Sequence, residues 1–122
     1  MFKKYLVALF VLCGLSSSLM AENIYPISRE MGSGTRGAFV DIFDVKKQIG
    51  NKKIDATSKK AEVTNSTGVM ITTVANSKNA IGYISLGSLN DTVKAVKIDG
   101  VTPSVENVNN KSYTVFRPFN LA

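Results

Sequence analysis

The stretch Ser28-Arg29-Glu30-Met31-Gly32-Ser33-Gly34-Thr35-Arg36-Gly37-Ala38-Phe39 decides how this chain begins to fold and what it can bind. It joins a predicted strand, residues 23–28, to a predicted helix through a glycine-rich turn. Glycine lets backbone N–H groups approach a ligand closely, and the first turn of a helix leaves N–H groups unpaired at the positive end of its dipole. The hydroxyls of Ser33 and Thr35 and the planar, charged fork of Arg29 add donors that suit an oxyanion. The stretch therefore predicts a site for a phosphate-like anion.

The residues after this turn predict a helix over 35–49, followed by a polar loop. Apolar side chains recur at helical spacing on one face of this segment, at Phe39, Ile42, Phe43 and Ile49. Gly50-Asn51 is predicted to end the helix, because either residue tolerates the left-handed conformation common at that position. Residues 52–61 are mostly polar and are predicted to form a loop.

The rest of the chain predicts alternating helices and strands. A second helix is expected to be capped at Asn65, Ser66 or Thr67, with an inner face of Val69, Met70, Thr73 and Val74. Strands are expected at residues 80–86, 93–98 and 113–117, with a turn at Asp99-Gly100 and a short helical segment over 103–108. This order predicts an α/β fold, a mixed sheet flanked by helices. The glycine-rich turn then lies at the carboxyl end of the first strand, where such sheets usually bind ligands.

Residues 1–21 have the pattern of a secretory signal peptide, and residues 22–122 are predicted to form one domain. Lys3 and Lys4 precede an uncharged apolar run over residues 5–15, and small or polar residues lead to a predicted cleavage after Ala21. The single cysteine, Cys13, lies in the apolar run, where Leu12 stands at the place that a lipid-attachment signal reserves for a small residue. We therefore expect a periplasmic or secreted protein with neither a disulfide nor thiolate chemistry in its mature part.

The charge of the chain mildly favours anionic partners. The 122 residues carry 15 basic and 9 acidic side chains, so removing Lys3 and Lys4 leaves a net charge of +4. The lysines occur as scattered pairs, and aromatic residues are not interleaved with them as they are in nucleic-acid platforms. The pattern indicates solvated surface lysines and no nucleic-acid partner.

The sequence offers little for catalysis. It has no histidine, no cysteine after Cys13 and no carboxylates at metal-ligand spacing, so we expect neither an enzyme nor a metal or other cofactor. Gly32, Gly34 and Gly37 also fit a dinucleotide fingerprint with Asp55 as the ribose acceptor, although the segment before Asp55 is too polar for the buried strand that this motif needs. A glycine turn of this kind can also be a tight connection that binds nothing.

Four blocks of the sequence resemble the periplasmic solute-binding proteins of phosphate ABC transporters. They are residues 28–39, Ala80-Ile81-Gly82-Tyr83, residues 97–103 and residues 113–118, and their order and spacing agree with those of the family. The resemblance implies a type II periplasmic-binding-protein fold, in which two lobes close around phosphate. This chain corresponds to the second lobe, and the resemblance implies that Arg29, Ser33, Gly34 and Thr35 contact the phosphate.

The chain departs from that family at two points. Many relatives carry an acid two residues after the arginine, where it can orient the guanidinium, whereas this chain has Met31 there and Glu30 one position earlier. The first lobe, which supplies further donors and an aspartate that accepts the proton of phosphate, is not matched by any segment. The resemblance therefore implies weak binding in isolation, about −4 kcal/mol or millimolar affinity, with a reduced basis for distinguishing phosphate from sulfate.

The departures also widen the set of expected partners. Besides phosphate or a similar oxyanion, these are an ABC permease, a complementary lobe or a second copy of the chain. Phe116 and Phe119 lie near the end of the predicted lobe, where exposed apolar side chains would favour such docking. The alternative to a binding protein is thus an interaction module that needs a partner lobe.

Overall fold

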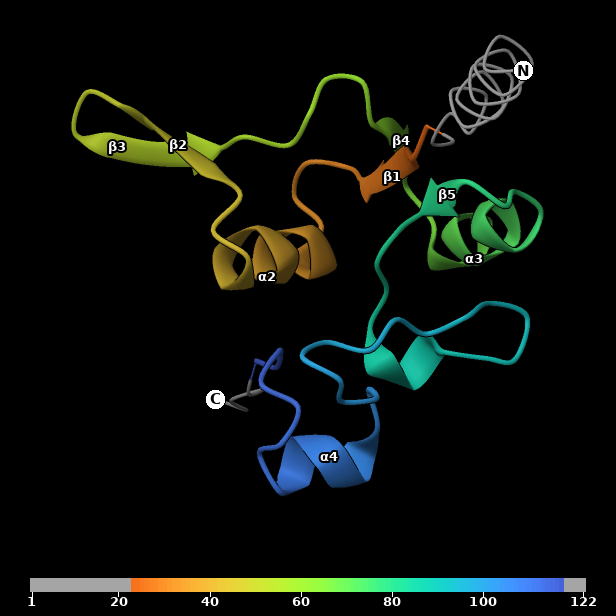
Figure 1. Ribbon diagram of the computed structural model, residues 1–122. Coiled ribbons are helices and arrows are strands. Elements are labelled where there is room, and N and C mark those ends of the chain that lie inside the picture. Colours follow the sequence, from red (N-terminus) through yellow and green to blue (C-terminus); the bar gives the residue numbers. More distant parts are fainter. Residues whose placement is uncertain (1–22, 118–122) are drawn as a thin grey trace, which may run out of the picture.

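A computed structural model describes residues 23–117 of the chain. The predicted signal peptide and its cleavage site, and Phe119, lie outside these residues. A three-stranded sheet forms the centre, with β1 (Tyr25–Arg29) between β4 (Glu62–Thr64) and β5 (Ala80–Ile81). Both neighbours run parallel to β1 (Figure 1). The expected α/β class is confirmed, and the sheet itself is parallel.

Two helices, α2 (Gly34–Ile42) and α3 (Thr67–Ala75), follow β1 and β4 and pack beside the sheet. The apolar core of the described residues is small. It consists of Ile27 on β1, Val40 on α2 and Met70 on α3, each at most 5% exposed. These side chains lie on the sheet and on the two helices that pack beside it, and burying them stabilises this packing.

The helix predicted over residues 35–49 is wrong in its second half. The backbone of Asp44 turns into the left-handed region (φ 50°), which stops the helical ladder just after Ile42. Strand β2 (Lys46–Ile49) then pairs with β3 (Lys52–Asp55) in an antiparallel hairpin. Gly50-Asn51 is therefore a hairpin turn, with Gly50 at φ 57°, and the first four residues of the predicted loop are a strand.

The second helix is confirmed, with Ser66 as its cap. The Ser66 hydroxyl accepts a hydrogen bond from the backbone N–H of Val69 (3.3 Å). Met70 is buried as expected, and Thr73 and Val74 are half-buried. Val69, which we placed on the inner face, is half exposed, so the buried stripe is narrower than predicted.

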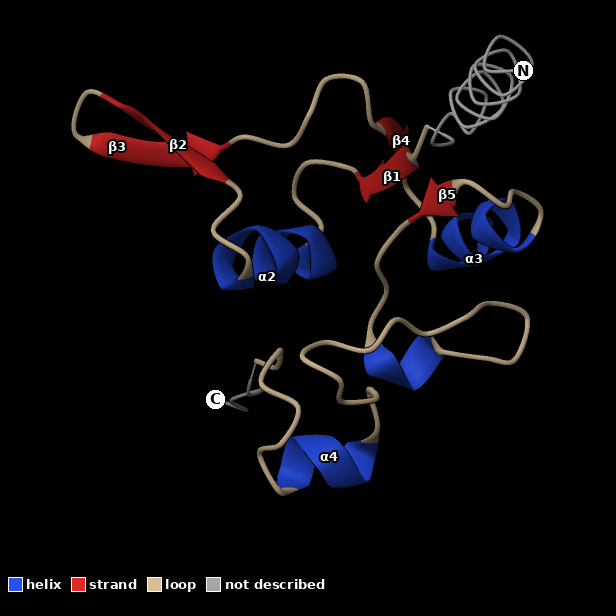
Figure 2. Ribbon diagram, viewed as in Figure 1, coloured by secondary structure: helices blue, strands red, loops and turns tan. Residues whose placement is uncertain are grey.

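Residues 82–117 are mostly loop, as Figure 2 shows in tan. The turn at Asp99-Gly100 is confirmed: both residues have positive φ, and Ile98 and Val101 pair across it. A 3₁₀ turn (Leu86–Ser88) and α4 (Val105–Asn109) are the helical elements of this region. The predicted strands over 93–98 and 113–117 are absent from the described structure, because neither segment pairs with another strand. The strand predicted over 80–86 is confirmed only at Ala80–Ile81, where it pairs with β1, and residues 82–86 have no partner strand.

Candidate anion-binding site

The candidate site lies at the carboxyl edge of the sheet, where β1 and β4 both end. Arg29 and Thr64 are partners in the last pair of the parallel register, so both strands leave the sheet at the same edge. Each leads within a few residues to a helix, α2 after β1 and α3 after β4 (Figure 1). Two helix N-termini are thus brought to one edge, which is the arrangement that favours anion binding in α/β folds.

Arg29 is held in place by two neighbours at this edge. Its Nε and Nη2 donate to the two carboxylate oxygens of Glu30 (2.9 and 3.2 Å), and its Nη1 donates to the hydroxyl of Thr67 on α3 (3.2 Å). The Arg29 side chain is only 14% exposed. The hydrogen bond from Arg29 holds the pKa of Glu30 below its usual value. Glu30 therefore orients the guanidinium from the position beside it, although the acid two residues after the arginine is missing.

The first turn of α2 presents unpaired backbone donors. Ser33 caps the helix, because its hydroxyl accepts from the backbone N–H of Arg36 (3.3 Å). Within residues 23–117, the N–H groups of Gly34 and Thr35 meet no acceptor. Gly32 supplies a positive φ of 90° that turns the chain from β1 into the helix. These two N–H groups are the donors that the sequence predicted for an anion.

Thr35 contacts Ser85, a residue for which the sequence predicts no role in the site. Its hydroxyl lies 3.3 Å from the hydroxyl of Ser85, in the extended segment that follows β5. Because β5 pairs with β1, the segment after it passes the start of α2. A serine in a predicted strand carries no signal of this contact, since the contact depends on which strands are neighbours.

Arg36, in contrast, is committed to structural contacts. Its Nε donates to Asp55 Oδ2 (2.8 Å) and its Nη1 to the backbone carbonyl of Arg29 (2.8 Å). The other carboxylate oxygen of Asp55 accepts from the N–H and hydroxyl of Thr57. The pKa of Asp55 is lowered to about 2, chiefly by its hydrogen bond from Arg36. With both oxygens engaged, Asp55 is not poised to receive a ribose, which argues against the dinucleotide alternative.

Tyr83 fixes the end of β1 from the other side. Its hydroxyl accepts from the backbone N–H of Arg29 (3.1 Å) and lies 2.9 Å from the buried hydroxyl of Ser28. Its ring stacks on Phe39 of α2, with centroids 4.2 Å apart. Tyr83 is thus a packing residue, and it also holds the backbone from which the Arg29 side chain extends.

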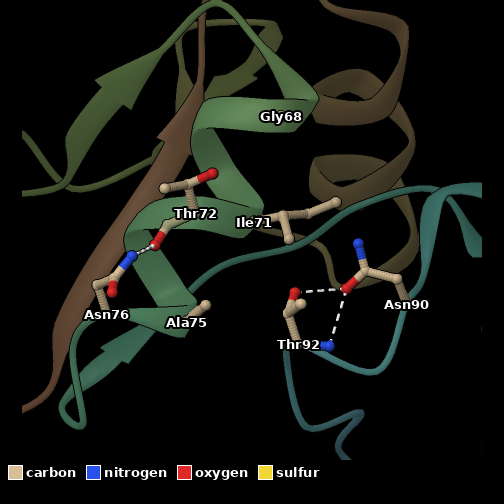
Figure 3. Close-up of a pocket in the computed structure, with 7 residues that line it drawn as sticks. All are labelled: Gly68, Ile71, Thr72, Ala75, Asn76, Asn90 and Thr92. Carbon is tan, nitrogen blue, oxygen red and sulfur yellow. Dashed lines mark hydrogen bonds between the residues drawn. The ribbon is translucent and has the colours of Figure 1, made fainter.

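An open depression elsewhere on the molecule has a different character. It lies between α3 and residues 90–92, and Figure 3 shows Asn90 bonded to Thr92 there rather than pointing at a ligand. Its lining is uncharged, with Gly68, Ile71, Thr72, Ala75, Asn76, Asn90 and Thr92 as members. Across the described residues there is no cluster of metal-ligating side chains and no helix with the length and apolar character of a membrane span. The Arg29 edge therefore remains the best candidate for an anion.

This arrangement is similar to part of two solved structures that are described as phosphate-binding components of ABC transporters. The chain is similar to the phosphate-binding protein of a phosphate ABC transporter from Streptococcus pneumoniae TIGR4 (52% identity, TM-score 0.71, covering 75% of this chain and 36% of that one). It is also similar to an ABC-type phosphate transport receptor from Vibrio cholerae (28% identity, TM-score 0.73, 80% of this chain and 39% of that one).

Curated relatives carry the same description. The chain is 51% identical over 107 residues to phosphate-binding protein PstS 2 of Streptococcus agalactiae, covering 87% of this chain and 36% of the relative. It is 49% identical over 115 residues to the protein of that name from Streptococcus pneumoniae, covering 91% and 40%. No family model matches the chain. The chain is thus homologous to phosphate-binding proteins of ABC transporters, and it spans between 36 and 40% of the length of these curated relatives.

Proposed function

We propose that this chain binds inorganic phosphate, or a similar tetrahedral oxyanion, reversibly and without catalysis. Arg29, Ser33, Gly34 and Thr35 are its ligands, and the chain acts as the second lobe of the substrate-binding component of a phosphate ABC transporter. The relatives described above support this role. The signal-like sequence of residues 1–21 supports a location outside the cytoplasm, where such a component meets its permease.

One observation carries the proposal: a positioned guanidinium and a pair of unpaired N–H groups lie on the same short turn. Arginine has five N–H donors, and Glu30 and Thr67 engage three of those of Arg29. Two remain for an anion. The N–H groups of Gly34 and Thr35 lie at the positive end of α2, so charge and hydrogen-bonding capacity favour the same ligand.

The same contacts predict weak and poorly selective binding. Among residues 23–117, the carboxylate in contact with Arg29 is that of Glu30, and it is engaged by the guanidinium, so it does not offer a free acceptor to the proton of a phosphate. Thr35 is half-buried and Gly34 is exposed, so a bound anion keeps contact with water. We therefore expect millimolar affinity, about −4 kcal/mol, for phosphate and for sulfate alike.

Phosphate titration followed by NMR tests this proposal. The amide signals of Gly34 and Thr35 should shift with a millimolar midpoint, and Arg29→Ala should remove the shift. Arg29→Lys keeps the charge but loses the fork, so an intermediate loss is expected. Lys94→Ala removes an equal charge at an exposed site in the 93–98 segment and should leave the midpoint unchanged. Unshifted amides at 50 mM phosphate, roughly forty times the expected midpoint, would contradict the proposal.

A second candidate is an interaction module that binds phosphate only when a complementary lobe or a second copy is present. It is favoured by the small core: among residues 23–117 three large apolar side chains are buried and fourteen are exposed. Phe116, which we expected at an exposed edge, is 41% exposed. Sedimentation at increasing concentration, with and without phosphate, separates the candidates. A dimer that forms together with the amide shifts supports the module, whereas a monomer that shows the shifts excludes it.

A further inference from the structure

The β2–β3 hairpin extends away from the sheet and its two helices (Figure 1). Its register pairs Lys46 with Asp55, Lys47 with Ile54, Gln48 with Lys53 and Ile49 with Lys52. Because side chains alternate along a strand and directly paired residues share a face, the hairpin has two distinct faces. Lys46, Gln48, Lys53 and Asp55 make up one, and Lys47, Ile49, Lys52 and Ile54 make up the other.

The first of these faces is fixed to α2 at the base of the hairpin. Lys46 pairs with Asp41 (2.6 Å), and Asp55, its cross-strand neighbour, pairs with Arg36 (2.8 Å). Both partners belong to α2. The face formed by Lys47, Ile49, Lys52 and Ile54 therefore points away from that helix, and we call it the outer face.

The outer face is basic and apolar at once. All four of its side chains are exposed, with Ile49 at 54% and Ile54 at 39%. Each isoleucine lies directly opposite a lysine, and the face contains no acid. Within the described residues neither Lys47 nor Lys52 has an acidic partner. Two apolar side chains with a lysine opposite each have the composition of a surface that contacts an anionic, partly apolar partner.

We propose that the outer face of the hairpin docks on the surface of an anionic lipid bilayer. Lysine ammonium groups pair with headgroup phosphates while their hydrocarbon stems lie along the interface. The two isoleucines enter the boundary between headgroups and acyl chains, which removes their apolar area from water. A soluble polyanion would satisfy the lysines and leave the isoleucines exposed, so the alternation of the two residue types favours lipid.

The expected strength is modest and sensitive to salt. Each lysine near an anionic membrane strengthens binding by about fivefold, so Lys47 and Lys52 together contribute a factor of about 25. Raising the salt to about 1 M shortens the screening length to about 3 Å and should remove most of this factor. The contact is therefore a reversible one that orients the lobe on a membrane rather than an anchor.

A single tryptophan tests the proposal, because the chain contains none of its own. Ile49→Trp places the reporter on the outer face, and Gln48→Trp places a matched control on the opposite face of the same strand. The full chain is used, so that residues 1–21 contribute equally to every variant. With phosphatidylglycerol vesicles the emission of the Ile49→Trp variant should shift to the blue and lose its quenching by acrylamide. The Gln48→Trp variant should change little, and phosphatidylcholine vesicles should affect neither.

Charge variants complete the test. In the Ile49→Trp background, Lys47→Gln with Lys52→Gln should raise the lipid concentration at the midpoint of the blue shift about 25-fold. Lys59→Gln with Lys60→Gln removes the same charge from an exposed loop outside the hairpin and should leave the midpoint within about twofold. Any of three results would overturn the proposal. The two lysine pairs could change the midpoint lipid concentration equally, the emission of the Gln48→Trp and Ile49→Trp variants could shift equally, or phosphatidylglycerol could cause no blue shift.

Discussion

The first half of the described chain, residues 25–81, and the second half, residues 82–117, both contain capped helices, but only the first half contains the parallel sheet. Serine caps begin a helix in both: Ser33 and Ser66 in residues 25–81, and Ser104 in residues 82–117. The paired strands of the parallel sheet and all three buried apolar side chains belong to the first half. Caps and turns form from residues a few positions apart, whereas a strand needs a neighbour with which to pair. Local structure therefore forms in both halves, whereas the structure that depends on packing is confined to the first half.

The largest expected effect comes from removing a buried side chain in the first half. Met70 is 1% exposed and approaches Gly82 so closely that a Cβ there would lie 2.4 Å from its Sδ. Met70→Ala should lower the free energy of unfolding by about 2–5 kcal/mol, because it removes the transfer energy and leaves a cavity. Chemical denaturation followed by circular dichroism measures this loss.

Val105→Ala is the matched change in the second half. Val105 begins α4 and is 67% exposed, so its truncation should change the unfolding free energy by less than about 0.5 kcal/mol. If Met70→Ala and Val105→Ala lower the free energy of unfolding equally, Val105 is buried in solution. The proposed difference in packing between the two halves is then wrong.

The elements that the sequence predicted well are those coded by neighbouring residues. The cap at Ser66, the buried Met70 and the turn at Asp99-Gly100 follow from local chemistry, and each is confirmed. The prediction for residues 43–49 failed because Ile49 suits a strand as well as a helix, whereas Phe43 lies at the end of α2 and outside β2. The left-handed backbone of Asp44 and the pairing of β2 with β3 decided between helix and strand.

The candidate site also combines features that neighbouring residues determine with contacts between residues far apart in the sequence. The turn that carries Arg29, Ser33, Gly34 and Thr35 could be read from the sequence, because the donors lie within seven residues. The contacts of Arg29 with Thr67 and of Thr35 with Ser85 could not, since they join positions 38 and 50 residues apart. These contacts depend on the strand order β4-β1-β5, which no local pattern encodes. The ligand roles of the four residues stay predictions.

A smaller effect is expected where the hairpin joins the first half. The Arg36–Asp55 pair is mostly shielded from water, with the two side chains 11% and 19% exposed. Since the pKa of Asp55 is lowered from 3.8 to about 2, its pairing stabilises the fold fully above pH 3.8 and is lost as the pH falls to about 2. Asp55→Asn should therefore lower the free energy of unfolding at pH 7 by about 1–2 kcal/mol.

The pH dependence makes this prediction specific. The difference in stability between the original chain and the Asp55→Asn variant should shrink between pH 4 and pH 2, because the carboxyl of Asp55 becomes protonated in that range. Asp91→Asn removes an exposed carboxylate from the loop-rich half and should cost less than about 0.5 kcal/mol at pH 7. A difference for Asp55→Asn that persists at pH 2 would show that lost packing, rather than charge, causes the destabilisation.

The smallest expected effect concerns Thr67, which links the start of α3 to Arg29 at the end of β1. Its hydroxyl accepts from Arg29 Nη1 at 3.2 Å, while the cap of α3 is supplied by Ser66. Thr67→Val keeps the shape of the side chain but removes this acceptor. If Arg29 binds phosphate as proposed, losing one hydrogen bond of about 1 kcal/mol should weaken the affinity about fivefold by letting the guanidinium move. The NMR titration measures the change.

Two further variants separate positioning from stability. Thr67→Ser keeps a hydroxyl and should restore most of the affinity, whereas Thr73→Val removes a hydroxyl on the same helix that donates to the Val69 carbonyl and does not touch Arg29. Thr73→Val should therefore leave the phosphate midpoint unchanged. Equal weakening by Thr67→Val and Thr73→Val would mean that α3 acts only by holding the sheet together. The contact between Arg29 and Thr67 matters for binding only if Thr67→Ser keeps the phosphate affinity that Thr67→Val loses. Serine keeps the hydroxyl that accepts from Arg29, so this result would assign the affinity to the hydrogen bond and not to the packing of α3.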